Sequence, residues 1–260
     1  MQEVHGTKEW AASNFNIISG CKHGCWYCYA RSLAARFGRH ATEDWTEERP
    51  NKKQRTRFGK RTGRIMFPSS HDITPESVKE CGDVLLGMLK AGNDVLVVSK
   101  PHLSVVQELV KRLAWHKDKV LFRFTIGSTS DKDLQLFEPG APPFAERLAA
   151  LRCAHEAGFE TSVSAEPMLT RDPEALFKKV SPYVTDAVWF GLLNGVSYLI
   201  TMNRPPAEVA KAARELRDYW TRTNVQGLYA VLGGHEKVKW KESIKKVVGI
   251  AVATEKGLDI

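Results

Sequence analysis

The sequence has no uninterrupted apolar run of the roughly 18 residues that a membrane-spanning helix needs, so we expect no such helix. The first residues, Met1 to Lys8, are polar and lack the apolar stretch of a secretory signal. The sequence also lacks an internal repeat, a low-complexity linker and a clear domain boundary, which favours a single domain over residues 1–260. We therefore expect a cytoplasmic protein without a membrane partner, in a compartment where thiols stay reduced.

Cysteine is scarce, with five residues among 260. In a reducing compartment, cysteines are more often metal ligands or catalysts than disulfide partners. Cys81 and Cys153 fall within expected helices, where we interpret them as core residues. The other three share eight residues with the spacing C-x3-C-x2-C, in the segment Cys21-Lys22-His23-Gly24-Cys25-Trp26-Tyr27-Cys28.

Acidic residues are absent between Arg49 and Arg64, although the chain as a whole has 30 of them against 38 Lys and Arg. The formal net charge is +8, and this one stretch holds eight cations, enough to account for the whole excess. A concentrated cationic segment attracts phosphate backbones because binding releases condensed counterions, and Phe58 within it is suited to stacking on a base. The segment therefore indicates a nucleic-acid partner, with a solvated basic loop as the alternative. The cations are Arg49, Lys52, Lys53, Arg55, Arg57, Lys60, Arg61 and Arg64.

Short apolar runs alternate with amphipathic stretches, which predicts an α/β fold with parallel strands. Both a partial (β/α)6-type TIM barrel and a doubly wound open sheet fit this order, and both gather ligand sites at the carboxyl ends of the strands. The strands are expected at Asn14–Ile18, Arg64–Phe67, Asp94–Val98, Val120–Ile126, Glu160–Ser164 and Ala187–Gly191, with a weaker one near Leu228–Leu232. The helices are expected at Tyr29–Phe37, Thr74–Lys90, Leu103–Trp115, Phe144–Ala157, Asp172–Val180, Pro206–Trp220 and Lys237–Lys246.

Three thiolates on one tight loop are able to hold one metal centre, and thiolates suit either zinc or an iron–sulfur cluster. Zinc would need a fourth ligand; His23 lies too close within the loop, which leaves His5 or His40. A cubane cluster normally takes four cysteines, so three would leave one iron with an open position for a ligand. The spacing favours iron–sulfur, while zinc stays an alternative.

The segment resembles the signature of the radical S-adenosylmethionine (SAM) superfamily, C-x3-C-x-aromatic-C after the first barrel strand, at Cys21, Cys25, Tyr27 and Cys28. The resemblance implies a partial barrel with a [4Fe–4S] cluster on the three cysteines and S-adenosylmethionine on the unique iron. It also implies an external flavodoxin- or ferredoxin-like electron donor. One electron from the cluster would cleave the C5′–S bond and release a 5′-deoxyadenosyl radical that abstracts a substrate hydrogen.

Further segments resemble the spore photoproduct lyase branch, so that the likeness covers about residues 14–191 and leaves 192–260 as an extension. Branch members use a cysteine as a late hydrogen donor near the position of Ser70 or His71, and a serine O–H bond is too strong for that step. Thymine-dimer repair by the same route is therefore not carried over. The similar segments are Val97-Val98-Ser99-Lys100, Phe124-Thr125-Ile126, Glu138-Pro139-Gly140-Ala141-Pro142-Pro143, Arg147-Leu148 and Ala165-Glu166-Pro167-Met168.

Polar groups after the second strand match the place where the superfamily holds the cofactor's ammonium group. Ser69, Ser70 and Asp72 offer the oxygen acceptors that a cation needs, although the same residues are suited to capping the helix that follows. The motif residue Tyr27 is counted with them as a cofactor contact.

Further candidates follow later strands. Lys100 and Ser128 are expected to meet the cofactor's carboxylate or ribose. Arg147 either pairs with that carboxylate or forms a structural ion pair with Glu138. Glu166 and Asn194 are candidates for facing the substrate.

These observations together predict a radical SAM enzyme whose substrate is a nucleic acid or nucleotide. The basic segment joins a helix to a strand, and such connections usually lie opposite the active site, but this one exceeds the usual length and is able to reach the mouth. One rival is a zinc-stabilised nucleic-acid-binding protein without catalysis. The other is a radical SAM enzyme that acts on a peptide or small metabolite.

Overall fold

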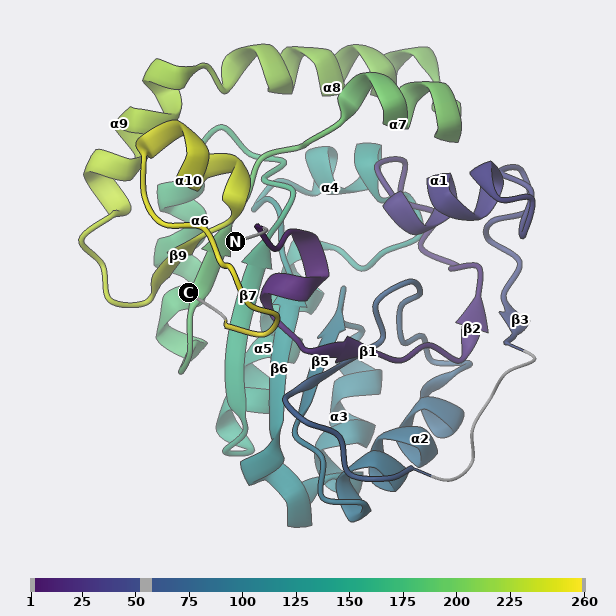
Figure 1. Cartoon of the computed structure of the whole chain (residues 1–260). Coiled ribbons are helices and arrows are strands. Elements are labelled where there is room, and N and C mark those ends of the chain that lie inside the picture. Colours follow the sequence, from purple (N-terminus) through teal and green to yellow (C-terminus); the bar gives the residue numbers. More distant parts are fainter. Residues whose placement is uncertain (1–2, 52–57, 259–260) are drawn as a thin grey trace.

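Seven parallel strands form the main sheet, in the order β1-β4-β5-β6-β7-β8-β9 (Figure 1). The computed structural model describes residues 3–51 and 58–258. Because β1 and β9 stand at opposite ends of the order, the barrel is open, and the predicted α/β partial barrel with parallel strands is confirmed. The strands are β1 (Ser13–Asn14), β4 (Ile65–Phe67), β5 (Val95–Ser99), β6 (Val120–Thr125), β7 (Glu160–Ala165), β8 (Val188–Phe190) and β9 (Val238–Trp240).

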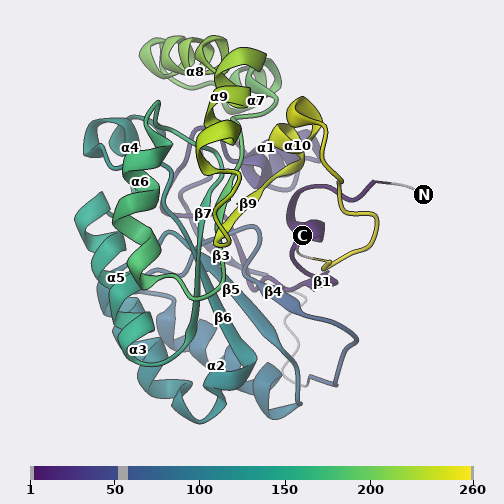
Figure 2. The ribbon, with the colours of Figure 1, turned by 90° about the vertical axis from the view of Figure 1, so that its left-hand side faces the viewer.

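A layer of helices covers one face of the sheet, while the described residues near the two ends of the chain lie on the other. Figure 2 shows α2, α3, α5 and α6 on the outer face, which is the arrangement of a barrel wall and not of a doubly wound sheet. No helix among residues 3–51 and 58–258 is long and apolar enough to span a membrane. The α-helices are α1 (Tyr29–Arg36), α2 (Val78–Lys90), α3 (Leu103–Arg112), α4 (Asp131–Phe137), α5 (Phe144–Glu156), α6 (Pro173–Val180), α7 (Val196–Asn203), α8 (Ala207–Tyr219), α9 (Arg222–Leu232) and α10 (Glu242–Val248), with short 3-10 helices η1 (Gly6–Glu9), η2 (Ala114–Lys119) and η3 (Ser181–Tyr183).

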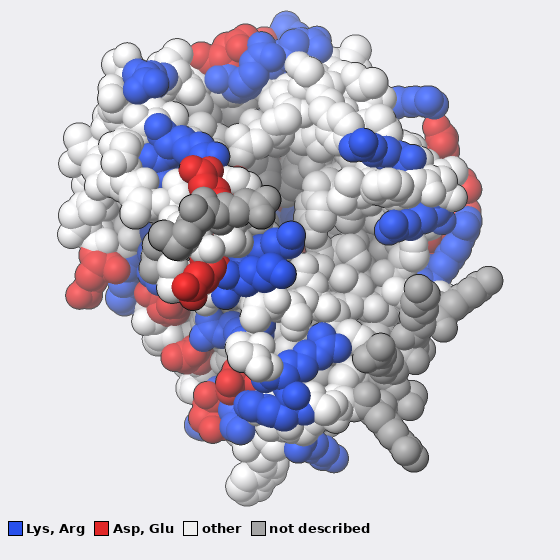
Figure 3. Space-filling view, viewed as in Figure 1, with Lys and Arg blue, Asp and Glu red and all other residues white. Residues whose placement is uncertain are grey.

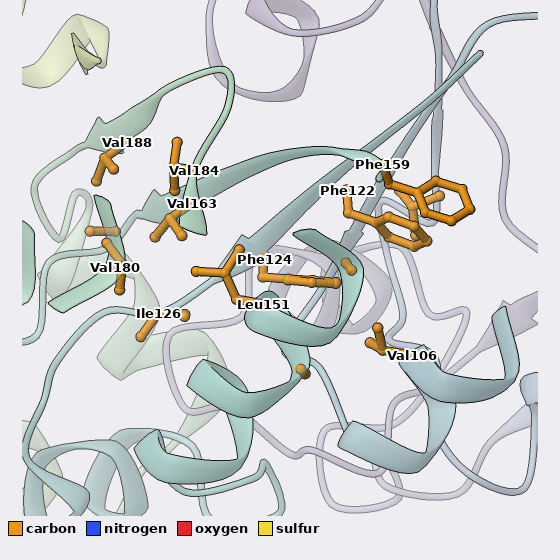
Figure 4. Packing of buried hydrophobic residues seen from close by; sticks show 14 of the residues in the cluster. Val106, Phe122, Phe124, Ile126, Leu151, Phe159, Val163, Val180, Val184 and Val188 are labelled. Atoms are coloured by element: carbon orange, nitrogen blue, oxygen red, sulfur yellow. The ribbon is translucent and has the colours of Figure 1, made fainter. Parts of the chain in front are cut away.

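Alternation along β6 divides the interior into two parts. Phe122 and Phe124 point toward the helices and pack in the main core with Leu151 of α5 (Figure 4). Arg123, between them, points to the inner face of the barrel, where its guanidinium is fully buried and lies 2.9 Å from Asp186. Successive strand residues face opposite sides, so the outer face holds the main apolar core, and the inner face holds Arg123 within a smaller apolar cluster that includes Trp10 and Trp189.

The first expected strand, Asn14–Ile18, is interrupted. β1 ends at Asn14, and Ile18 begins a separate short strand, β2 (Ile18–Ser19), which pairs antiparallel with β3 (Arg49–Pro50). The chain leaves the barrel sheet between these two strands. The cysteine segment therefore follows an excursion from the sheet and does not follow β1 directly.

The expectation for the last third of the chain was wrong in two places. Leu228–Leu232 is the end of α9 and not a strand, and Leu228 and Leu232 are both buried on one face of that helix, at the i, i+4 spacing. The helix expected over Lys237–Lys246 begins only at Glu242, because Val238–Trp240 pairs with β8 as the last strand. An apolar run this short fits either structure, and the neighbouring strand decides.

Candidate active site

A cavity of about 600 Å³ opens at the carboxyl ends of the strands. Its walls come from the cysteine segment, from residues after β4, β5 and β7, from the N-terminal residues 5–8 and from α7. Figure 3 shows the surface hollowed on the side of the N-terminal segment, with Lys and Arg side chains on several sides of the hollow. The volume lies within the usual range for sites that enclose a small molecule.

Eight of the ten residues predicted to bind a cluster or cofactor line this one cavity. The other two, Ser128 and Arg147, do not line the cavity. The structure also brings Glu166, Asn194 and His5 to the wall. The eight are Cys21, Cys25, Tyr27, Cys28, Ser69, Ser70, Asp72 and Lys100.

The three cysteines are held on a tightly wound loop. All three are free thiols, and Cys28 also caps α1, its sulfur accepting a hydrogen bond from the Arg31 backbone at 3.4 Å. Gly20 has a φ of +97°, and a Cβ there would lie 2.4 Å from the Glu47 carbonyl oxygen. The loop thus turns back closely on the chain after α1, which points its cysteines into one cavity.

Burial makes the three thiols poor acids in the absence of a metal. It raises the pKa of Cys25 to about 12 against the opposing charge of Lys100, and it raises the pKa of Cys21 and of Cys28 as well. A buried thiolate needs a compensating positive charge, which a soft metal centre supplies. The donor set therefore fits a thiolate-bound metal centre and fits a free reactive thiol poorly.

Asp72 is the centre of a buried network beneath the cysteine loop. Its carboxylate accepts hydrogen bonds from the Lys100 backbone at 2.9 Å, from the Ser99 hydroxyl and from His23 Nδ1 at 3.0 Å. Burial alone would raise the pKa of Asp72, but the charges of His23 and Lys100 and these hydrogen bonds lower it. Asp72 is therefore ionised, and its oxygens are largely engaged by the protein itself.

Lys100 extends from the end of β5 into the cavity. Its ammonium lies 4.0 Å from Asp72 and 5.6 Å from the centre of the Tyr27 ring. Burial alone would lower the pKa of Lys100, yet the surrounding Cys25, Tyr27, Glu138 and Asp72 groups raise it well above the ordinary value. Lys100 is thus a fixed cation beside the three thiols, suited to holding a carboxylate.

Asn16, which sequence reasoning did not single out, shapes the loop after β4. Its side-chain oxygen accepts from the backbones of Ser69 at 2.7 Å and Ser70 at 2.9 Å, and its amide donates to the Ser69 hydroxyl at 2.9 Å. Tyr29 donates to the Ser69 carbonyl oxygen. The predicted acceptors are therefore held in place, although Ser69 is already engaged by two other side chains.

Arg147 forms the structural ion pair that was one of its two predicted roles. It lies 2.5 Å from Glu138, both side chains are fully buried, and it also donates to the carbonyls of Pro142 at 2.7 Å and Thr125 at 3.2 Å. Tyr27 donates to the other oxygen of Glu138. The guanidinium thus supports the cavity wall from behind through Glu138 and Tyr27.

Ser128 is likewise used by its own loop. It is fully buried, accepts from the Ser130 backbone at 3.0 Å and lies 3.3 Å from Asp133. Its hydroxyl helps to form the start of α4, so the structure does not bring it together with the other predicted cofactor contacts.

A second buried network, which the sequence analysis missed, supports Glu166 from the far side of the wall. Lys241 has no exposed surface, and its ammonium lies 2.8 Å from Glu9, 3.5 Å from Glu166 and 3.0 Å from the Gly6 carbonyl oxygen. A Cβ at Gly191 would come within 3.0 Å of both Lys241 and Glu166 side chains, so glycine permits their approach. These residues are far apart in the sequence, and nothing local signals their meeting.

One group of side chains that commonly coordinate metals has its ligand atoms close enough together to bind a single ion. Among the residues that the structure describes, Cys21, His23 and Asp72 are the only three whose ligand atoms lie within 4.8 Å of one another. His23 is held between Asp72 and the Nε2 atom of His102, each at 3.0 Å. His40, a candidate zinc ligand, instead faces the carbonyls of Ala41 and Glu47 at 3.1 Å.

The described cations of the basic segment 49–64 contact the protein itself. Arg49 lies 2.9 Å from Glu47, and Lys60 contacts the Gly92 carbonyl oxygen. The Arg61 backbone donates to the Asn93 side chain at 2.7 Å, and the Arg61 guanidinium donates to the Ser13 hydroxyl at 3.4 Å. Lys52, Lys53, Arg55 and Arg57 lie outside the described residues, so the expectation that this segment binds nucleic acid stays a prediction.

Comparison with known proteins shows the fold. No protein-family model matches the chain. The chain is 26% identical over 202 residues to the uncharacterized protein ORF301 of Acidianus two-tailed virus, a match that covers 69% of this chain and 66%, just under two thirds, of that protein.

Two solved structures are similar to the chain over nearly its whole length. A double mutant of spore photoproduct lyase, with bound AdoMet and dinucleoside spore photoproduct, has a TM-score of 0.51 at 17% identity and covers 92% of this chain and 78% of its own. SuiB of Streptococcus suis, bound to S-adenosylmethionine, has a TM-score of 0.55 at 10% identity; the match covers 93% of this chain but only 53% of SuiB. The resemblance to radical SAM enzymes that the sequence predicts is thus confirmed for the fold.

Proposed function

We propose that the chain is a radical SAM enzyme that binds a [4Fe–4S] cluster through Cys21, Cys25 and Cys28 and modifies or repairs a nucleic-acid substrate. The observation that carries this proposal is the convergence of three buried free thiols and the fixed cation Lys100 on one cavity, in a fold shared with radical SAM enzymes. When bound, the cluster and S-adenosylmethionine supply a reductive cleavage of the C5′–S bond that leaves a carbon radical able to abstract hydrogen.

The chain's own residues have separate tasks in this proposal. Lys100 holds a carboxylate, because it is a largely buried cation on the cavity wall. Ser69 and Ser70 offer hydroxyl oxygens to an ammonium group from the loop that Asn16 shapes. Asp72 fixes the start of the segment after β5 through the Lys100 backbone. The cavity keeps bulk water from the reacting carbon.

The charge of the chain supports a nucleic-acid substrate over a peptide or small metabolite. The chain has a formal net charge of +8, and its sequence concentrates eight cations between Arg49 and Arg64. The similar lyase structure holds a dinucleoside, whereas SuiB has also been solved with a precursor peptide, so the fold accommodates both classes. The charge of this chain is the feature that favours polyanions.

The test is anaerobic reconstitution with iron and sulfide, followed by metal analysis and chromatography for 5′-deoxyadenosine after adding dithionite and S-adenosylmethionine. We expect about four irons per chain and formation of the product, and Cys25→Ala should abolish both. Cys153→Ala is the matched control, because Cys153 is a partly buried free thiol on α5 outside the cavity wall, and it should retain both. A single zinc without iron would refute the proposal and favour the site of Cys21, His23 and Asp72.

A further inference from the structure

Three exposed large apolar side chains form a stripe along α1 that begins at the cavity wall. The described residues include seven such side chains, and three of them, Tyr29, Leu33 and Phe37, stand at i, i+4 and i+8 along α1 and its carboxyl end, with 48%, 40% and 57% of their surface exposed. This spacing places them on one face of the helix, over about 12 Å. Tyr29 and the exposed Tyr198 of α7 also line the cavity.

Two arginines accompany this stripe. The guanidinium of Arg39 lies 5.0 Å from the centre of the Phe37 ring, and that of Arg36 lies 5.7 Å from it. Among the described residues, no carboxylate is within ion-pair distance of either arginine, and both are exposed. Their positive charge is therefore available to an anionic partner beside an exposed aromatic ring.

The acidic residues that follow α1 do not cancel this charge, because they are engaged elsewhere. Glu43 lies 3.2 Å from Arg204, Glu47 lies 2.9 Å from Arg49, and Glu48 accepts from the Lys22 backbone at 3.2 Å. Charge on the loop is thus largely compensated within the loop and its neighbours.

We propose that this α1 face, made of Tyr29, Leu33, Arg36, Phe37 and Arg39, binds a single strand of nucleic acid and leads it into the cavity. Bases stack on exposed aromatic rings whatever their sequence, and arginines beside the rings neutralise the phosphates. The length of the stripe matches about three nucleotides at the 3.4 Å spacing of stacked bases. The inference deepens the proposed function, on which it rests for the identity of the cavity.

The chain contains a matched control for this surface. Trp115 of η2 is 93% exposed, and Lys111, Lys117 and Lys119 are close to it in the sequence, so the segment offers an exposed aromatic ring and cations. It precedes β6 and therefore lies at the amino end of the strands, opposite the cavity. If every exposed aromatic ring near cations bound nucleic acid, Trp115 and Phe37 would contribute equally to the affinity for the oligonucleotide.

The experiment measures the fluorescence anisotropy of a fluorescein-labelled 15-residue oligodeoxythymidylate with the full chain, without S-adenosylmethionine, between 50 and 200 mM salt. We expect Phe37→Ala to raise Kd about fivefold or more, since each stacked base contributes measurably. Arg36→Gln/Arg39→Gln should reduce the slope of log Kd against log salt by about 1.4, the value for two phosphate contacts on a single strand. Trp115→Ala should leave Kd within about twofold, whereas an effect equal to that of Phe37→Ala would overturn the inference.

Other occupants of this face give distinct results. If the wild-type chain did not bind the oligonucleotide, the inference would be wrong. If Phe37→Ala converted a dimer into a monomer in sedimentation, the face would be a protein interface and the inference would also be wrong. Circular dichroism checks that the variants fold. Binding is measured apart from catalysis, so oligonucleotide binding without any 5′-deoxyadenosine formation would refute the proposed function and leave this inference standing.

Discussion

Replacing Arg147 with methionine separates its structural role from a cofactor role. Methionine keeps much of the volume of the side chain but removes the charge and all donors. Glu138 would then remain fully buried without its partner at 2.5 Å, and two backbone carbonyls would each lose a donor. Removing one member of a buried ion pair costs about 3–5 kcal/mol, so we expect the free energy of unfolding to fall by about that amount.

The assay is urea unfolding followed by circular dichroism on the metal-free chain. Arg152→Met is the matched control on the same helix, because Arg152 is 56% exposed and pairs with Glu156 across one turn at 3.4 Å. An exposed pair of this kind contributes about 0.3–0.5 kcal/mol. The double variant Glu138→Gln/Arg147→Met, which leaves no buried charge, should recover part of the loss.

The opposite outcome has a clear meaning. If Arg147→Met changed the free energy of unfolding by less than about 1 kcal/mol and instead abolished S-adenosylmethionine binding, Arg147 would act on the cofactor. The assignment to the wall behind Tyr27 would then be wrong.

Three further predictions concern other parts of the site. Burial raises the pKa of Glu9 to about 8 from an ordinary value of 4.5, so its protonated form is favoured in the folded state. The stability that Glu9 contributes is present below pH 4.5 and falls as the pH rises toward 8. Glu9→Gln should flatten this decline of the melting temperature with pH, and an unchanged pH profile of the melts would contradict the assignment. Asn16→Ala removes three hydrogen bonds to the loop after β4 and should weaken S-adenosylmethionine binding about tenfold by calorimetry, at about 1.4 kcal/mol; unchanged affinity would exclude that loop from the cofactor site. Gly20→Ala should destabilise the chain by more than about 2 kcal/mol in urea, because its Cβ would meet the Glu47 carbonyl, whereas Gly38→Ala, at a φ of +60° with open space around it, should cost only about 1 kcal/mol; equal losses would show that the contact is unimportant.

Predictions from the sequence were most accurate where the signal is local. Strands such as Val95–Ser99 and Val120–Thr125 are runs of β-branched and aromatic residues, and they differ from expectation by only a residue. The cysteine spacing is likewise contained in eight residues, so the loop that turns three thiols into one cavity is visible without the fold. The error at Leu228–Leu232 arose because an apolar run of five residues fits a strand as well as a buried helix turn.

Residues that act in pairs across the chain were harder to predict. The sequence left Arg147 with two roles, and only the position of Glu138 behind Tyr27 distinguishes them. Ser128 follows a strand end, as the site rule requires, yet its hydroxyl is turned to its own helix start. The α1 face was missed because exposure, and not residue type, distinguishes its stripe from a buried one.

The sequence by itself determined the parallel α/β class, the cysteine loop with its spacing and the excess of positive charge, since each depends on neighbours along the chain or on composition alone. Tertiary structure decided which carboxyl groups meet which cation: Glu9, Glu166 and Lys241 come together only because the N-terminal segment crosses the inner face of the barrel. Coulomb interactions in a buried site depend on separations of a few ångströms, and those separations are set by strand order and packing, which no local pattern encodes.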